Sequence, residues 1–272
     1  MLKFHGKMGD TMADKNYLHT AYSNSADGMN GFTTVYPNLN LLDGTKDFSG
    51  NWTNSRSWTT DGTYKGLTVK KRTGQWNGIY KTFTAPKDGT YTFSAYIKSS
   101  GNTANTIRYG GVNTTSAQKA LQKSMGNNFD WARDSVTLNL KANDSVWFKY
   151  EITGLGTDSI LWTAGHKLEI DSTATPWMPS SSEVTATDWL KYVGTYVDTN
   201  PVSSTDPSKY DWDEMKYRVY LDGVPVGGSK LLSFDFENLK AGTSYNVQVN
   251  QINGNDESDK SESVAFKTNV QK

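Results

Sequence analysis

The chain has 272 residues, and its 28 lysines and arginines are balanced by 28 aspartates and glutamates, with three histidines and no cysteine. A net charge of zero provides no field to attract a polyanion, which argues against nucleic acid or an anionic membrane surface as the partner. Without cysteine there is no thiol catalysis, zinc–thiolate site or disulfide, and no stretch approaches the ~20 apolar residues of a membrane span.

Residues 1–37 contain no apolar pattern that could form a core, and we predict an N-terminal attachment arm there. From residue 38 to residue 179, short strand-like runs alternate with turns rich in Gly, Asn, Asp and Pro. The predicted strands are Gly66–Lys71, Gly78–Phe83, Thr90–Lys98, Asp134–Leu140, Ser145–Ile152 and Ile160–Ile170. Many short strands at this spacing favour an antiparallel sandwich. The weakly helical run Thr115–Lys123 is expected to be part of a surface insertion.

The composition changes after Trp177, where the polar run Met178–Glu183 marks a domain boundary. Residues 180–272 are predicted to form a linker and a second, smaller β-sandwich. Its predicted strands are Tyr217–Leu221, Leu232–Phe236, Ser244–Ile252 and Ser263–Thr268. The fold class is therefore all-β, with two sandwiches in sequence.

Strand side chains alternate between the two faces of a sheet, so the phase of the apolar residues identifies the outer face. In the two most regular strands the core phase leaves aromatic and charged residues on the other side. The residues predicted to lie on the outer face and to bind a ligand are Trp76, Tyr80, Tyr96, Lys98, Trp147, Lys149 and Glu169. Exposed flat rings beside polar groups suit sugars, because the C–H face of a pyranose stacks on the ring while its hydroxyls bond to the polar groups.

The sequence argues against an enzyme, and we predict no catalytic residue, no metal-ligating residue and no cofactor. Most acids lie in turns, where they usually bond to the backbone. The three histidines are far apart, and the sequence contains no HExxH, GxSxG, P-loop or GxGxxG motif. His166 is in phase with Leu168 and Ile170, which indicates a satisfied, partly buried imidazole.

The first domain resembles a jelly-roll carbohydrate-binding module of the form found in tail and baseplate proteins of siphophages of Gram-positive hosts. The segments that carry the resemblance are Asn38–Leu42, Gly78–Phe83, Gly89–Lys98, Asp130–Arg133 and the closing pair Ala164–Glu169 and Thr173–Trp177. Two flanking segments, Leu18–Phe32 and Tyr192–Trp212, resemble segments recurrent in such tail proteins. The resemblance implies an accessory baseplate protein of a lactococcal-type phage, made in the host cytoplasm and located in the virion.

The same resemblance implies a module over residues 38–179 that binds host cell-wall polysaccharide without catalysis, and other baseplate or tail proteins as partners. Jelly-roll modules often hold a structural calcium, for which Asp43, Asp47 and Asp171 are candidate oxygen donors. The C-terminal region resembles a fibronectin type III module, with Leu239–Tyr245 similar to its tyrosine-corner region.

Two alternatives remain open at this point. The chain could be a structural adaptor of the baseplate without sugar binding, or a targeting module of a cell-wall hydrolase. An open groove on the outer sheet face would favour the sugar-binding hypothesis. A face plugged by the insertion at residues 110–128 would favour the adaptor.

Overall fold

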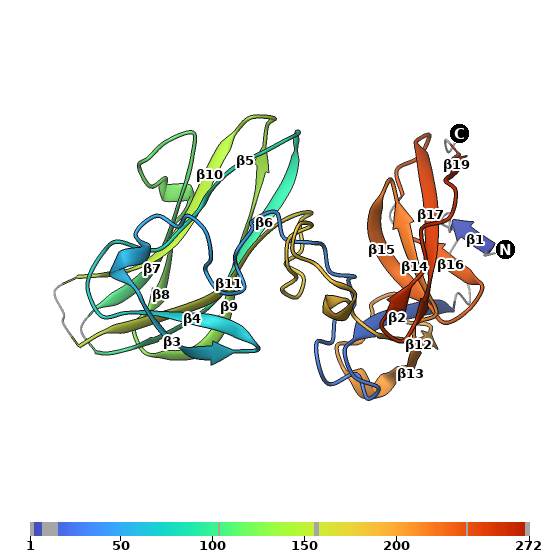
Figure 1. The fold of residues 1–272 in the computed structure, drawn as a ribbon, viewed down its shortest axis with the longest axis horizontal. Coiled ribbons are helices and arrows are strands. Elements are labelled where there is room, and N and C mark those ends of the chain that lie inside the picture. Colours follow the sequence, from blue (N-terminus) through green and yellow to red (C-terminus); the bar gives the residue numbers. More distant parts are fainter. Residues whose placement is uncertain (1–2, 7–15, 103, 155–157, 238, 270–272) are drawn as a thin grey trace. The chain divides into compact units, whose positions relative to one another are not determined.

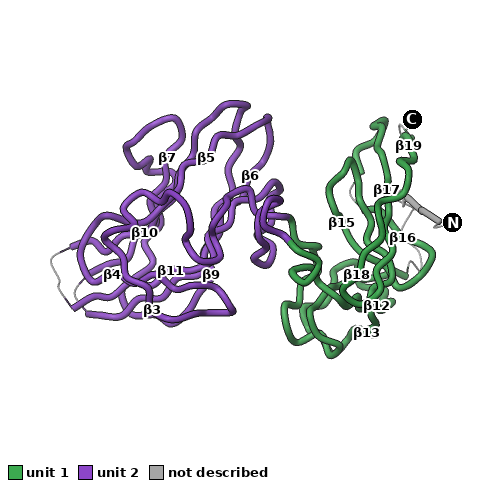
Figure 2. The backbone as a smooth tube through the Cα atoms, in the orientation of Figure 1, with its two compact units in different colours: residues 1–38, 185–272 green, residues 39–184 purple. Residues whose placement is uncertain are grey.

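The computed structural model of the chain describes residues 3–6, 16–102, 104–154, 158–237 and 239–269. Regular structure in these residues is almost entirely β, which confirms the predicted fold class (Figure 1). None of their helices is long and apolar enough to cross a membrane. The chain divides into two compact units, a sandwich unit of residues 39–184 and a composite unit of residues 1–38 and 185–272 (Figure 2).

The sandwich unit consists of two antiparallel sheets. The four-stranded sheet has the order β5 (Thr82–Thr84), β10 (Ser145–Thr153), β7 (Asn105–Val112) and β8 (Lys123–Gly126). The five-stranded sheet has the order β3 (Thr59–Tyr64), β4 (Leu67–Arg72), β11 (Ile160–Ile170), β6 (Gly89–Ser100) and β9 (Phe129–Leu140). Two short 3₁₀ turns, η1 (Ser55–Ser57) and η2 (Lys119–Leu121), lie in its loops.

The core lies between these sheets and follows the predicted alternation. On β6, Phe93 is buried and stacks on Phe148 of β10 with ring centroids 4.7 Å apart. Tyr96 of β6 belongs to a separate cluster of apolar residues on the opposite face. Period-two alternation of apolar and polar residues therefore positions both the core and the outer faces.

The composite unit contains the remaining sheets. A three-stranded sheet has the order β13 (Asp211–Glu214), β12 (Tyr192–Asp198) and β2 (Tyr17–Ser23). A second sheet has the order β15 (Val224–Ser229), β14 (Tyr217–Leu221), β17 (Ser244–Asn253) and β18 (Asp256–Glu257), and β19 (Val264–Lys267) also pairs with β17. The strand β1 (Lys3–Gly6) pairs in parallel with β16 (Ser233–Phe236), and the 3₁₀ turns are η3 (Ala186–Asp188) and η4 (Pro207–Lys209).

The segment predicted as a separate arm, residues 1–37, is part of the composite unit instead. Strand β2 pairs with β12 along its whole length, from Tyr17 opposite Asp198 to Ser23 opposite Tyr192. Its residue Tyr22 is 5% exposed. The sequence of this segment shows no core of its own because a single strand contributes only part of an apolar face. The strand with which β2 pairs, β12, lies far along the chain. Residues 7–15 of the predicted arm lie outside the described residues, and a role in attachment stays a prediction.

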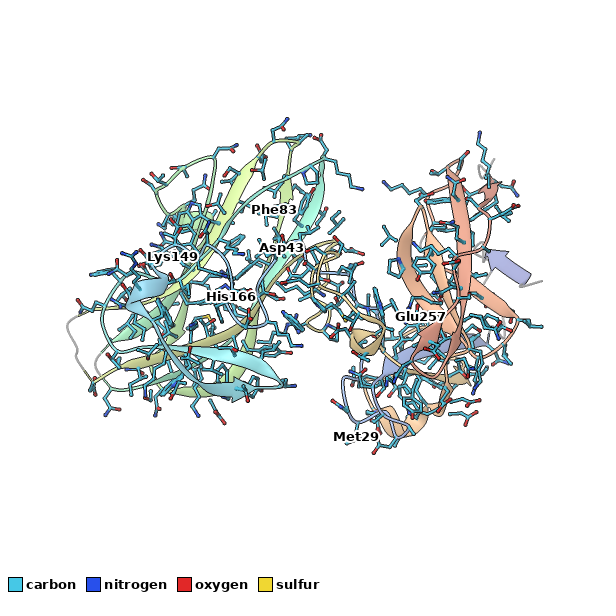
Figure 3. The ribbon with its side chains drawn as sticks, viewed as in Figure 1. Met29, Asp43, Phe83, Lys149, His166 and Glu257 are labelled. Atoms are coloured by element: carbon cyan, nitrogen blue, oxygen red, sulfur yellow. The ribbon has the colours of Figure 1, made fainter. Side chains whose placement is uncertain are left out.

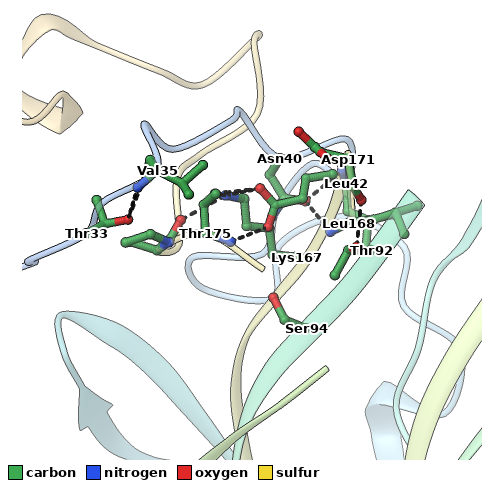
Figure 4. A network of polar contacts seen from close by, with 12 residues as sticks. Thr33, Val35, Asn40, Leu42, Thr92, Ser94, Lys167, Leu168, Asp171 and Thr175 are labelled. Carbon is green, nitrogen blue, oxygen red and sulfur yellow. Dashed lines mark hydrogen bonds and ion pairs between the residues drawn. The ribbon is translucent and has the colours of Figure 1, made fainter. Parts of the chain in front are cut away.

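The connections into and out of the sandwich unit are held together. The backbone N–H of Asn40 donates to the carbonyl of Pro179 (3.0 Å), and Asn40 forms a parallel bridge with Ser180. The Asn40 side chain donates to the carbonyl of His166 (2.9 Å) and accepts from the N–H of Leu168 (3.0 Å). One buried amide therefore fastens the entry segment to β11, beside the exit segment (Figure 4).

The region predicted to resemble a tyrosine corner has the expected hydrogen bond. The Tyr245 hydroxyl accepts from the backbone N–H of Lys240, five residues upstream (3.0 Å). This bond ties the start of β17 to the preceding loop, as in a tyrosine corner. The likeness of the whole region to a fibronectin type III module stays a prediction.

Candidate functional site

The outer face of the four-stranded sheet gathers three of the predicted ligand-binding residues. The Tyr80 and Trp147 rings lie 5.4 Å apart between centroids. The Lys149 ammonium lies 5.4 Å from the Trp147 centroid and 5.9 Å from that of Tyr80, and it forms an ion pair with Glu151 at 2.8 Å. Lys149 is labelled in Figure 3. We call this group, with Tyr109 on β7 and with Trp76 at the adjoining edge of the sheet, both described below, the four-stranded face.

Trp147 is on the outer face as predicted, but the expectation that it faces solvent is wrong. The indole is 7% exposed, and its Nε1 donates to the carbonyl of Thr114 (2.7 Å) in the loop after β7. A Cβ at position 111 would lie 2.8 Å from the indole, so Gly111 provides the space that the ring occupies. The loop thus closes one end of the face, and Trp147 forms its floor.

Trp76 is held at the edge of the same sheet with its side chain 50% exposed. Its backbone N–H donates to the carbonyl of Ile152 on β10 (3.2 Å), and its carbonyl accepts from Nε of Arg72 (2.6 Å). Its φ is 56°, a left-handed conformation that is strained for a bulky residue. Strain of this kind persists only where neighbouring contacts enforce it, and it concentrates at functional sites.

Two polar groups of the four-stranded face were not among the predicted site residues. Tyr109 of β7 lies opposite Lys149 of β10 and is half-buried. Desolvation raises the pKa of the Tyr109 hydroxyl, and the negative charge of Glu151 adds to the effect. The buried Glu151 carboxylate also accepts from the N–H of Gly78 (2.9 Å). Tyr109 was missed because β7 was not predicted: its inward phase contains Thr106, Arg108 and Gly110, so the strand lacks the usual alternation of apolar and polar residues.

Tyr96 and Lys98 lie on the outer face of the other sheet, the five-stranded face. The Tyr96 ring is 5.3 Å from that of Tyr64, which stacks on Trp131 with centroids 4.3 Å apart and planes at 13°. Lys98 forms an ion pair with Asp130 at 3.0 Å. The seven predicted residues therefore do not form one surface. Alternation tells which side of its own sheet a residue occupies, but not which sheet the strand joins.

Glu169 has the outward phase that was predicted, but the expectation that it faces solvent is wrong. Lys167 and Glu169 are both 0% exposed, with the ammonium 3.1 Å from a carboxylate oxygen. The closing segment, residues 173–177, covers them: the N–H of Thr175 donates to Glu169 (2.9 Å), and Lys167 donates to the carbonyl of Pro176 (2.8 Å). Figure 4 includes Lys167 and Thr175 in this polar network. The sequence pattern that carried the family resemblance is thus a buried structural element, and Glu169 is unavailable to a ligand.

Burial affects the protonation of the two basic side chains of this strand. It lowers the pKa of Lys167 to about 8, against the opposing effect of Glu169. It lowers the pKa of His166 to about 3. The His166 ring is 1% exposed, its Nε2 lies 2.8 Å from the Thr163 hydroxyl, and aromatic edges surround it, which confirms a satisfied imidazole but one more deeply buried than predicted.

The candidate calcium donors do not converge. Asp43 accepts from the Ser182 hydroxyl (3.0 Å), and Asp47 accepts from the N–H of Ser49 (2.9 Å). Within the described residues, no three His, Cys, Asp or Glu side chains lie close enough together to hold a metal ion. The structure therefore lends no support to a calcium site at Asp43, Asp47 and Asp171.

Comparisons with known proteins identify one extensive likeness. The chain is similar to a chain in the structure of the tripod (BppUct-A-L) from the baseplate of bacteriophage Tuc2009, with 44% identity, a TM-score of 0.74, and coverage of 96% of this chain and 100% of that one. A family model for the C-terminal domain of minor structural protein 5-like proteins matches residues 190–248, and a C1q domain model matches residues 71–162.

Weaker likenesses are to carbohydrate-binding domains. The CBM22-1 xylan-binding domain of Paenibacillus barcinonensis Xyn10C is 15% identical, with a TM-score of 0.33 and coverage of 52% of this chain and 96% of that one. A family 35 carbohydrate binding module from Clostridium thermocellum is 16% identical, with a TM-score of 0.32 and coverage of 42% and 89%. No curated protein sequence matches the chain.

Proposed function

The chain belongs to the family of phage baseplate proteins represented by the Tuc2009 tripod, and we propose that this virion component binds host cell-wall saccharide through the four-stranded face, without catalysis. The observation that carries the proposal is Trp76. A half-exposed indole is held in a strained backbone conformation by hydrogen bonds on both sides of its peptide unit. Such an arrangement costs stability and is explained if the ring has a ligand to contact.

The other groups of the four-stranded face suit a glycan. Tyr80 and Tyr109 combine an aromatic ring with a hydroxyl, and Lys149 is an ammonium donor beside both rings of the Tyr80–Trp147 pair. A pyranose can place its C–H face on a ring and its hydroxyls on these polar atoms. A site made of a few rings and polar groups provides few contacts to a sugar, so each copy binds weakly. Many copies on one particle raise the effective concentration and make adsorption effective.

A baseplate adaptor without sugar binding is the second candidate. The loop over Trp147, within the insertion at residues 110–128, supports it, because this loop closes one end of the face. The exposure of Trp76 supports the saccharide-binding hypothesis instead. The loop that covers Trp147 leaves the Trp76 side chain half-exposed. Binding of purified host cell-wall polysaccharide by the intact chain separates the two.

Replacing Trp76 with alanine should weaken binding to host cell-wall polysaccharide about tenfold. The loss of one stacking ring is worth roughly 1–1.5 kcal/mol, and an exposed edge residue contributes little to the core. Isothermal titration calorimetry on the intact chain, with circular dichroism to verify folding, measures the change.

The matched control is Lys98→Ala on the five-stranded face, which should bind as the parent does. Equal binding by Trp76→Ala and the parent would refute the assignment to the four-stranded face. Loss in Lys98→Ala alone would transfer the site to the other sheet. Trp147→Ala is a poor probe, because that indole is buried and its loss would disturb the fold.

A further inference from the structure

The composite unit contains a cavity of about 200 Å³ that the proposed function does not use. Three parts of the chain meet around it: the start of β12, the junction of β13 and β14, and the β17–β18 hairpin. The residues that line it are Ala186, Trp189, Leu190, Lys191, Tyr192, Glu214, Met215, Arg218, Ile252, Gly254, Asn255 and Glu257. All of them belong to the composite unit, and Glu257 is labelled in Figure 3.

A buried charged network forms one wall of the cavity. Arg218 is 2% exposed; its Nη1 donates to the Glu257 carboxylate, and its Nε donates to the Tyr36 hydroxyl (3.1 Å). The guanidinium carbon lies 4.5 Å from the centroid of the Trp189 ring. The Arg218 guanidinium is therefore held by a carboxylate, a hydroxyl and an aromatic ring while it lines the cavity.

The network is incomplete at one atom. Asn250, opposite Arg218 in the sheet, donates from Nδ2 to Glu257 (2.7 Å). Its carbonyl oxygen is buried and has no partner among the described residues. The carboxylate of Glu257 is therefore fixed from two sides, by Arg218 and by Asn250, while it still lines the cavity.

The lining specifies a small, neutral and partly apolar ligand. Two cations, Lys191 and Arg218, are balanced by two anions, Glu214 and Glu257, so the wall has no net attraction for a charged molecule. Carboxylates accept and the cations donate, which matches hydroxyl groups that do both. The edge of Trp189 and the side chains that complete the apolar wall offer a surface for C–H groups.

We infer that this cavity is a binding site for one neutral pyranose unit, separate from the four-stranded face. The volume is below the ~300–1,000 Å³ of sites for drug-sized ligands, so a single ring is the size that fits. This inference is independent of the proposed saccharide binding at Trp76, because the two sites share no residue.

The test uses the intact chain and single-residue variants of it. Ala186 is exposed and lines the cavity, so Ala186→Trp should fill the entrance without disturbing the core. We expect neutral monosaccharides (glucose, galactose, N-acetylglucosamine) to bind with millimolar affinity, and Ala186→Trp to weaken that binding at least about tenfold. Saturation-transfer NMR and calorimetry measure it, and Lys98→Ala on the five-stranded face should leave it unchanged.

Each remaining outcome counts against the inference. Absence of binding by all three sugars, or equal binding by Ala186→Trp and the parent, would refute the site. Binding of glucose 1-phosphate but of no neutral sugar would refute the neutral ligand. Loss in Trp76→Ala but not in Ala186→Trp would assign the sugar to the four-stranded face.

As a second probe, Lys191→Met keeps the aliphatic stem and should lower affinity severalfold.

Discussion

Replacing Glu169 with alanine is expected to lower the free energy of unfolding of the sandwich unit by about 3–5 kcal/mol, because it leaves the Lys167 ammonium buried without its counter-charge. Both side chains are 0% exposed, so water cannot take the place of the carboxylate. The variant also removes the acceptor for the N–H of Thr175, which releases the closing segment from β11. Urea unfolding followed by tryptophan fluorescence measures the loss, since most of the nine tryptophans lie in this unit.

The double variant Lys167→Met/Glu169→Leu is the informative control. Replacing a buried ion pair with apolar residues of similar volume is often close to neutral, so the double variant should be more stable than Glu169→Ala. If the double variant were as unstable as Glu169→Ala, the cost would come from lost packing against the closing segment and not from an isolated charge. Lys98→Ala, which removes a half-buried lysine paired with the exposed Asp130, should change stability by less than about 0.5 kcal/mol.

Acidification from pH 7 to pH 4 should destabilise the sandwich unit by about 3 kcal/mol through His166 alone. The native pKa of His166 is lowered to about 3 by burial, whereas the unfolded chain titrates near its ordinary value of 6.5. Between these values the unfolded state binds a proton that the native state does not. Stability therefore rises with pH across this window and is lost as the pH falls below about 6.5.

The variant His166→Gln isolates this effect from the titration of carboxylates. Glutamine can still bond to the Thr163 hydroxyl but takes up no proton. We expect the difference in stability between pH 7 and pH 4 to shrink by about 3 kcal/mol relative to the parent. An identical pH profile for parent and variant would mean that the buried imidazole does not control acid stability. The NMR shift of the ring, measured down to pH 4, provides a direct check of its neutral state.

The sequence predicted the all-β class and the inward and outward phase of the strands with long alternation, β6 and β10 above all. Phase is a local property that the residues of one strand determine. The assignment of Tyr96 and Trp147 to one surface failed because sheet membership depends on pairing between distant segments, which no single strand encodes.

The sequence also did not predict that some residues with the outward phase would be buried. Trp147 and Glu169 have the correct phase for an outer face, but each is covered by a segment that crosses its sheet. In the case of Trp147 a signal existed: Gly111, opposite it on the neighbouring strand, leaves room for an indole. For Glu169, the closing segment at residues 173–177 supplies a hydrogen-bond donor, the backbone N–H of Thr175. Trp76 gave no sign of its strained backbone.

The pairing of β2 with β12 means that the two ends of the described chain build one unit, and that the sandwich unit is an excursion between Asn38 and Thr185. The bridge between Asn40 and Ser180 brings the outgoing and returning strands of this excursion side by side. Genetic exchange at these two neighbouring points could replace the whole sandwich by another without breaking a strand of the unit that remains.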